Sequence, residues 1–294
     1  MLSLSDSPVQ RAAVFAHFDI DNRIDDYVIY YLKKIREVCA CVIFVSTSDL
    51  RKQEISKIEG LCEKVIVREN KGHDFISYKY GLSILEKNKY EEIVLCNDSV
   101  YGPFFTLWEV FNKMQTRECD FWGMTENSDI AYHVQSYFIV FKKKVIQSNC
   151  FKEFWDNISI ENDKSEIIKK YEIGLTQFLI KEGFIPEAYI RIKSSFLKTL
   201  RVKTSFMSIK SHTDVIKKLR RLIRGKLGIN PTHFYWKALI TEYNMPFIKV
   251  AILRDNFKNV NIEDYPHILN KYPDYDTSLI QRHLERVKGR YTVK

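Results

Sequence analysis

The sequence predicts an α/β protein with one Rossmann-type, mostly parallel central sheet and a C-terminal helical extension. Short apolar runs recur along the N-terminal part of the chain, helical repeats of apolar residues separate them, and polar clusters follow several of the runs. The chain has 294 residues, of which 45% are hydrophobic. This is enough material for one large domain with a substantial core.

The apolar runs predict strands because they are continuous, as in parallel strands that are covered on both faces. Apolar residues at helical spacing follow the first strand from Ile24 to Ile35 and the third strand from Phe75 to Leu85. A further helix is expected over residues 174–181. The expected strands span residues 12–18, 40–45, 64–68, 92–96, 120–123, 136–141 and 189–192.

Three parts of the chain are expected to differ in role. Residues 1–192 form the catalytic core, residues 193–228 are a basic amphipathic segment, and residues 229–294 complete the active site. Within the basic segment, residues 215–227 contain no acid, and their apolar side chains fall on one helical face. Such a helix can lie in the headgroup plane of an anionic membrane. The alternative is an ordinary packed helix with a solvated basic face.

Composition and net charge indicate which classes of partner the protein binds and in which compartment it works. The net charge of +9 favours anionic partners such as nucleotides or membrane surfaces. No RNA-recognition or zinc-finger signature is present, so we expect no nucleic-acid partner. The six cysteines form no CxxC pair, which favours reduced thiols over a zinc site. Without a signal peptide or an apolar span, we expect a cytoplasmic protein, peripheral at the inner face of the membrane if the basic segment binds there.

Several common catalytic motifs are absent from the sequence. The glycines include no GxG pair, and there is no Walker A loop, no HExxH and no GxSxG elbow. These absences argue against dinucleotide-binding, P-loop, zincin and α/β-hydrolase chemistry.

A polar turn follows the strand at residues 92–96. Asn97 and Asp98 stand at its carboxyl end, where ligands bind in open α/β sheets. Mg²⁺ and Mn²⁺ prefer carboxylate and phosphate oxygens, so we expect Asp98 to hold such a cation against a donor diphosphate. The alternative is a turn that opens the next helix. The Gly102-Pro103 turn just beyond favours a specialised loop.

The segment between the third strand and its helix is the second candidate. Gly72 allows close approach of the backbone to a ligand, and the helix N-terminus that follows favours anions. Asn70 and Asp74 are suited to hydrogen-bond a pyrimidine edge or a ribose. Asp74 is also a good helix N-cap, and both roles are compatible.

Two carboxylates and one histidine are candidates for the chemistry itself. A sugar hydroxyl is a poor nucleophile, so its proton must pass to a base, and Glu172 is the first candidate with Glu126 as the second. An acid just before a helix, such as Glu172, is also favoured there by the helix dipole. His233 stands at a loop-to-helix junction from which it can reach a diphosphate or a metal, although a lone histidine is more often structural.

Aromatic and polar residues of a later segment form a candidate acceptor platform. Trp122, His133 and Gln135 are expected to contact the acceptor sugar. The alternative for the apolar strand residues Phe121, Tyr137 and Ile139 is burial in the core.

Taken in order, these segments resemble the rhamnan synthesis protein F family over residues 14–255. Any one of the matching runs is common, but the ordered set is specific. The matching runs lie at residues 24–28, 67–75, 96–103, 120–123, 133–138, 170–175 and 230–236.

The resemblance implies a GT-A-type, inverting glycosyltransferase that uses Mg²⁺ or Mn²⁺. It also implies a dTDP-β-L-rhamnose donor and a growing, lipid-linked saccharide acceptor in synthesis of cell-wall polysaccharide or O-antigen. Asp98 matches the metal-binding acid of GT-A enzymes, but it stands in Asn-Asp-Ser where those enzymes carry Asp-x-Asp. The alternative is a catalytically inactive subunit that binds a saccharide or a partner enzyme.

Overall fold

The computed structural model describes residues 9–128, 130–161, 163–191, 230–257 and 259–290. Its centre is an eight-stranded sheet in the order β3-β2-β1-β4-β8-β6-β7, with β9 paired to β6. The bounds of these strands are β1 Arg11–His17, β2 Cys41–Ser46, β3 Lys64–Val67, β4 Glu92–Asn97, β6 Phe121–Asn127, β7 His133–Val134, β8 Phe138–Lys142 and β9 Pro186–Ile190.

Most strands of the sheet are parallel. β3, β2, β1 and β4 form a parallel group, and β9 runs parallel to β6. β8 is antiparallel to both β4 and β6, and β7 is antiparallel to β6. The predicted α/β class with a mostly parallel sheet is therefore confirmed.

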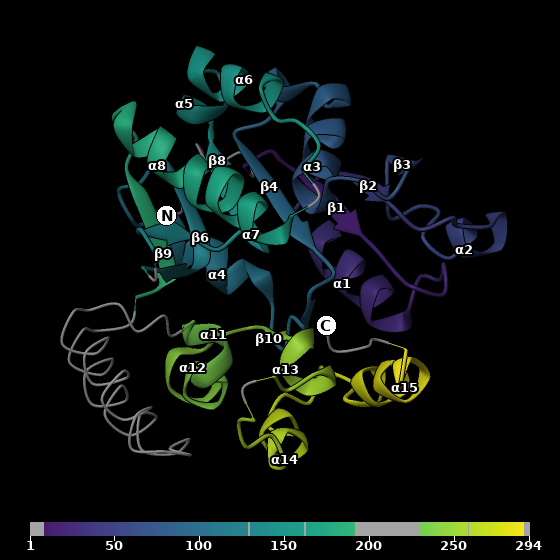
Figure 1. Cartoon of the computed structure of the whole chain (residues 1–294). Helices are drawn as coiled ribbons and strands as arrows, with labels where there is room; N and C mark the ends of the chain where they lie inside the picture. Colours follow the sequence, from purple (N-terminus) through teal and green to yellow (C-terminus); the bar gives the residue numbers. More distant parts are fainter. Residues whose placement is uncertain (1–8, 129, 162, 192–229, 258, 291–294) are drawn as a thin grey trace, which may run out of the picture.

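Helices cover both faces of the sheet (Figure 1). β1 alternates between two cores: Ala13 and Phe15 face one, and Ala12 and Val14 face the other. The first core also contains residues of α1, α4 and the C-terminal helices, and the second contains residues of α3, α6 and α8. The helical elements are α1 Asp26–Arg36, α2 Lys52–Ser56, α3 His73–Ile84, η1 Lys87–Lys89, α4 Leu107–Gln115, α5 Lys143–Ile146, α6 Asn149–Asp156, α7 Lys164–Ile167, the π-helix η2 Ile168–Ile173, and α8 Gly174–Lys181.

The predicted elements differ from the observed ones mainly at their ends. The helix predicted at residues 174–181 is α8, with the same bounds. The strand predicted to end at residue 123 continues to Asn127, because Glu126 and Asn127 pair with β7. β9 begins earlier than predicted, since Pro186 already pairs with Phe121. Proline is tolerated there because the first residue of a strand need not donate a ladder hydrogen bond.

The C-terminal segment is attached to the sheet through a two-stranded ladder. β10 Ile248–Lys249 pairs antiparallel with β5 Val100–Tyr101, which follows the turn after β4. Helices surround this ladder, as predicted for the C-terminal extension. They are α11 Pro231–Phe234, α12 Trp236–Tyr243, α13 Val250–Arg254, α14 Tyr265–Leu269 and α15 Ser278–Val287.

The predicted basic segment at residues 193–228 lies outside the described residues, so its membrane role stays a prediction. In the part of the chain that the structure describes, no helix combines the length and the apolar composition that crossing a bilayer requires.

Close packing between α3 and β1 leads to a test of the fold. A Cβ atom added to Gly81 of α3 would lie 2.2 Å from Cγ1 of the buried Val14. Helix propensity alone predicts that Gly81→Ala stabilises the protein by up to ~1 kcal/mol. We expect the opposite sign, a loss of about 1–3 kcal/mol in the free energy of unfolding, because the core is overpacked. Urea denaturation measures this loss.

The matched control is the double variant Val14→Ala/Gly81→Ala. Removing the two methyl groups of Val14 makes room for the new Cβ, so the double variant should be less destabilised than the sum of the single variants. A Gly81→Ala protein as stable as wild type, or strictly additive effects, would contradict the packing between these elements.

Candidate active site

A pocket of about 500 Å³ lies at the carboxyl ends of the parallel strands. Part of its lining comes from the segments after these strands. Phe18, Thr47 and Asp98 directly follow β1, β2 and β4, and Asn70 is the third residue after β3. Other parts come from the segment before β8, from η2 and from the C-terminal segment. The volume is in the range of small-molecule binding sites.

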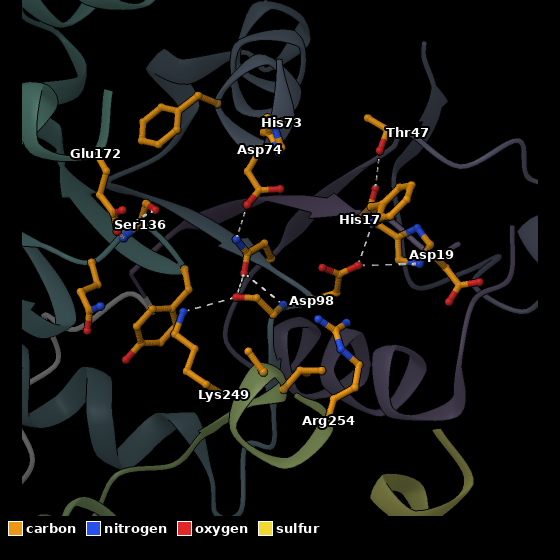
Figure 2. Close-up of a pocket in the computed structure, with 18 of the residues that line it drawn as sticks. His17, Asp19, Thr47, His73, Asp74, Asp98, Ser136, Glu172, Lys249 and Arg254 are labelled. Carbon is orange, nitrogen blue, oxygen red and sulfur yellow. Dashed lines mark hydrogen bonds and ion pairs between the residues drawn. The ribbon is translucent and has the colours of Figure 1, made fainter. Parts of the chain in front are cut away.

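Most of the predicted site residues line this pocket, although they come from distant parts of the sequence (Figure 2). Gly72, which precedes α3, adopts the left-handed conformation with φ 73° and forms the turn into that helix. Gly72 does not line the pocket itself; it allows the tight turn between Asn70 and His73, which do. The predicted residues that line the pocket are Asn70, Asp74, Asn97, Asp98, Gln135, Glu172 and His233.

Trp122 is not available to an acceptor. Its side chain is fully buried, with ring centroids of Phe111 and Phe138 at 5.4 and 5.9 Å. The predicted acceptor contact of Trp122 is therefore wrong, because β6 is covered on both faces and this ring packs in one of the two cores.

His133 and Glu126 also lie outside the set of residues that line the pocket. His133 is 3% exposed, and its Nδ1 lies 2.9 Å from the carbonyl oxygen of Ala131. Glu126 is held near Tyr132, and burial raises the pKa of the Glu126 carboxyl. Of the acceptor residues predicted, Gln135 alone lines the pocket, where its Oε1 accepts a hydrogen bond of 2.7 Å from Thr125.

Asp98 is a partly buried acid in the site. Its Oδ2 accepts a hydrogen bond of 2.8 Å from the backbone amide of Phe18, and Nε2 of His17 lies 4.0 Å away. Burial raises the pKa of Asp98 well above its usual value, and the negative charges of Asp74 and Asp19 raise it further. A bound cation would offset both effects, since it favours the charged carboxylate.

Asn97 holds the second acid of the site in place. Its Nδ2 donates to Oδ2 of Asp74 at 2.7 Å, and its Oδ1 accepts from Oγ of Ser99 at 2.6 Å. The turn after β4 is thus tied to the first turn of α3. Asn97 therefore acts as a positioning residue for Asp74.

Arg68 organises the loop between β3 and α3, a role that the sequence analysis did not anticipate. Its guanidinium donates to the carbonyl oxygens of Glu69, Lys71 and His73 at 2.9, 2.6 and 2.7 Å. It also donates to Oγ of Ser77. One side chain thus fixes the loop that carries Asn70 and leads to Asp74.

Glu172 lies on the π-helix η2, which directly precedes α8. Its Oε1 accepts hydrogen bonds from the backbone amide and from Oγ of Ser136, at 2.9 and 3.0 Å. π-helical turns occur frequently at functional sites. The two donors fix the direction of the carboxylate on the pocket wall (Figure 2).

Comparison with known proteins gives the family. Residues 42–220 match the rhamnan synthesis protein F family. The chain belongs to this family. It is similar to the virulence protein VirA of Vibrio anguillarum, with 28% identity over 201 residues that cover 66% of this chain and 64% of VirA. It is also similar to the uncharacterized protein y4gN of Sinorhizobium fredii, with 29% identity over 149 residues, 49% of this chain and 39% of that protein. The chain thus spans less than two-thirds of the length of these relatives.

Solved structures with similar folds have low similarity scores. The glycosyltransferase GlyE of Streptococcus pneumoniae gives a TM-score of 0.43 at 11% identity, covering 96% of this chain and 64% of GlyE. A 4-diphosphocytidyl-2C-methyl-D-erythritol synthase of Anaerococcus prevotii gives 0.39 at 13% identity, covering 74% and 97%.

Several polar residues of the pocket were missed from the sequence. Within the described ranges, Asp19, Asp25 and His283 offer ligand atoms within 4.8 Å of one another. The guanidinium of Arg286 is ion-paired with both Asp19 and Asp25. Positive charge is therefore already present in this cluster, which stabilises the contact between α15 and the loop after β1.

The predicted metal ligands Asp98 and His233 do not belong to a three-ligand group among the described residues. Mg²⁺ needs fewer ligands from the protein, because it is commonly bound by one or two carboxylates together with substrate phosphates and water. Asp98 and Asp74 line the same pocket and repel each other electrostatically. This pair of hard oxygen donors fits Mg²⁺ or Mn²⁺ better than the imidazole of His233 does.

The loop held by Arg68 gives a testable prediction. Arg68→Lys keeps the charge but cannot reproduce the fan of hydrogen bonds to three carbonyl groups. We expect amide hydrogen exchange over residues 69–74 to become about 10-fold faster, because loss of charge-assisted hydrogen bonds costs about 1.5–3 kcal/mol locally. Mass spectrometry of the exchanged protein measures this rate.

The control for this variant is Arg51→Lys, since Arg51 is exposed. That substitution should leave exchange over residues 69–74 unchanged. If Arg68→Lys also leaves it unchanged, Arg68 does not hold the loop.

Proposed function

We propose that this member of the rhamnan synthesis protein F family is an inverting glycosyltransferase. Its proposed donor is dTDP-β-L-rhamnose, and its proposed acceptor is a growing, lipid-linked cell-surface polysaccharide. One observation carries the proposal: polar residues from distant segments of the chain converge on one pocket at the carboxyl ends of the parallel strands. Family membership supports a role in polysaccharide synthesis.

In this proposal the sheet side of the pocket binds the donor. Asn70 and Asp74 hydrogen-bond the base or the ribose, and His233 approaches the phosphates from the C-terminal segment. Asp98, with Asp74 beside it, would hold Mg²⁺ or Mn²⁺. Such an ion, when bound, supplies positive charge that stabilises the leaving diphosphate.

Glu172 is the proposed base. The acceptor hydroxyl oxygen attacks the anomeric carbon of the donor sugar, and its proton passes to the Glu172 carboxylate. The bond from the anomeric carbon to the diphosphate oxygen breaks, and the nucleoside diphosphate leaves with the electron pair. Ser136, which donates two hydrogen bonds to Oε1 of Glu172, keeps the carboxylate directed at the pocket. Proton removal of this kind typically contributes 10²–10⁴-fold to the rate.

The direct test is donor turnover by the purified protein. dTDP-rhamnose, UDP-glucose and GDP-mannose are each incubated with protein and Mn²⁺, and release of the nucleoside diphosphate is followed by chromatography. In parallel, dTDP, UDP and GDP are compared in a thermal-shift panel with and without Mn²⁺, since a ligand that binds the native state alone raises its melting temperature. Nucleotide binding without any release of diphosphate, even with a saccharide acceptor present, would favour the inactive binding subunit instead.

Asp98→Asn tests the proposed metal and diphosphate site. The substitution keeps the size of the side chain but removes the negative charge that a hard cation requires. We expect donor turnover to fall by at least about 10²-fold, while the unfolding midpoint in urea stays close to wild type or rises, because a partly buried charge is removed. Wild-type turnover at limiting Mn²⁺ would remove Asp98 from the mechanism.

Glu172→Gln tests the base. The glutamine keeps the shape of the side chain but cannot accept the proton, so transfer should slow by about 10²–10⁴-fold while donor affinity changes little. Single-turnover kinetics separates the rate of transfer from donor binding.

The matched control is Glu126→Gln, at the second candidate base. Because Glu126 does not line the pocket, this variant should keep a rate near wild type. If Glu126→Gln shows the large loss and Glu172→Gln does not, the two roles are reversed.

A further inference from the structure

Two cationic side chains reach the pocket from the C-terminal segment. Lys249 is the last residue of β10, and Arg254 is the last residue of α13. Of the described residues that line the pocket, these two are its lysine and its arginine. Figure 2 shows both extending toward the turn that carries Asp98.

The backbone fixes Lys249 relative to the acidic turn. Lys249 is in register with Val100, and the amide of Val250 donates to the carbonyl oxygen of Ser99 at 2.9 Å. The hydrogen bonding between the two segments therefore reaches Ser99, the residue after Asp98. These hydrogen bonds join the C-terminal segment to the turn after β4, and they fix the position of Lys249 relative to that turn.

The ammonium group of Lys249 is held over an aromatic ring. Its Nζ lies 3.8 Å from the ring centroid of the buried Tyr137 and 3.4 Å from Oγ of Ser99. A cation–π contact of this kind orients a lysine and keeps its charge. The ammonium is therefore pre-positioned at the pocket wall before any ligand binds.

Arg254 is oriented by its neighbour. Its Nε and Nη2 donate to the two carboxylate oxygens of Asp255 at 2.8 and 2.7 Å. This pairing fixes the plane of the guanidinium on the pocket wall. A guanidinium held in one plane is well suited to phosphate oxygens.

The other ionisable groups that line the pocket are mainly acids, so an anionic ligand requires positive charge from elsewhere. Asp74, Asp98 and Glu172 are part of its lining, and so are Asp19 and Asp25, whose carboxylates are already ion-paired with Arg286. Burial lowers the pKa of His283 to about 4, so this imidazole is neutral at pH 7. A diphosphate entering this pocket would be repelled by the acids unless cations face it.

We infer that Lys249 and Arg254 together form a binding site for the diphosphate of a nucleotide donor, next to the turn that carries Asp98. This inference rests on the proposed function. The two cations contact phosphate oxygens in the donor complex and remain with the nucleoside diphosphate as it leaves. The C-terminal segment thus supplies the charge that recognises the phosphates, and the sheet edge supplies the contacts to base and ribose.

The test compares a nucleoside diphosphate with its nucleoside. Calorimetry measures binding of dTDP and thymidine, and of UDP and uridine, to wild type, Lys249→Met, Arg254→Met and the double variant. Each single variant should lose about 10- to 100-fold in affinity for the diphosphate, the range expected for a hydrogen bond to a charged group. Affinity for the nucleoside should stay at the wild-type value. Methionine is chosen for Lys249 because a thioether packs well on the Tyr137 ring.

Two controls accompany the variants. Lys249→Arg keeps a cation over Tyr137 and should retain most of the affinity for the diphosphate. Arg282→Gln removes an arginine of α15 whose side chain is 51% exposed and pairs with Asp26, so it should bind like wild type. Urea denaturation of every variant shows whether it is folded.

The outcomes separate this inference from the proposed function. If wild type binds dTDP or UDP but the methionine variants bind it equally well, the diphosphate site is overturned and the proposed function stands. Equal losses for nucleoside and diphosphate would indicate a structural role and would also overturn it. If wild type binds no nucleotide of the panel, the proposed function fails and the inference fails with it.

Discussion

The candidate site depends on the parallel pairing of β1 with both β2 and β4. This pairing brings the carboxyl ends of the strands to one edge of the sheet, so residues far apart in sequence become neighbours. Buried side chains on both faces of β1 fix its register, because a shift of one residue would exchange the two cores. The positions of Asp98 and of the loop after β3 follow from that register.

The part of the site that belongs to strand ends could be predicted from the sequence. Asp98 and Asp74 each follow an apolar run, and in a parallel sheet this alone places them at one edge. Lys249 and Arg254 could not be found in this way. They reach the pocket through pairing between residues 100–101 and 248–249. A ladder of two residues between segments so far apart in the sequence has no local pattern from which it could be predicted.

Trp122 shows the opposite failure, in which a residue type suggested a role that its strand position excludes. Aromatic rings suit sugar binding, but β6 is covered on both faces: Trp122 packs in one core and its neighbour Phe121 packs in the other. Gln135 and Glu172 do line the pocket, as predicted. Polar side chains are rarely buried without a partner, so they tend to line a cavity or a surface.

The π-helix that carries Glu172 limits how this segment can change by insertion or deletion. A π turn holds a surplus residue relative to an α-helix, and each α-helical residue advances by about 100° around the axis. Deleting one residue from Ile168–Ile173 would make the segment a regular α-helix. Glu172 would then be rotated relative to Leu175 and Leu179, the buried leucines of α8. The carboxylate could then face Ser136, or α8 could keep its apolar side inward, but one regular helix would not satisfy both. The π-helical turn therefore allows Glu172 to face the pocket while the apolar side of α8, which follows directly, packs in the core.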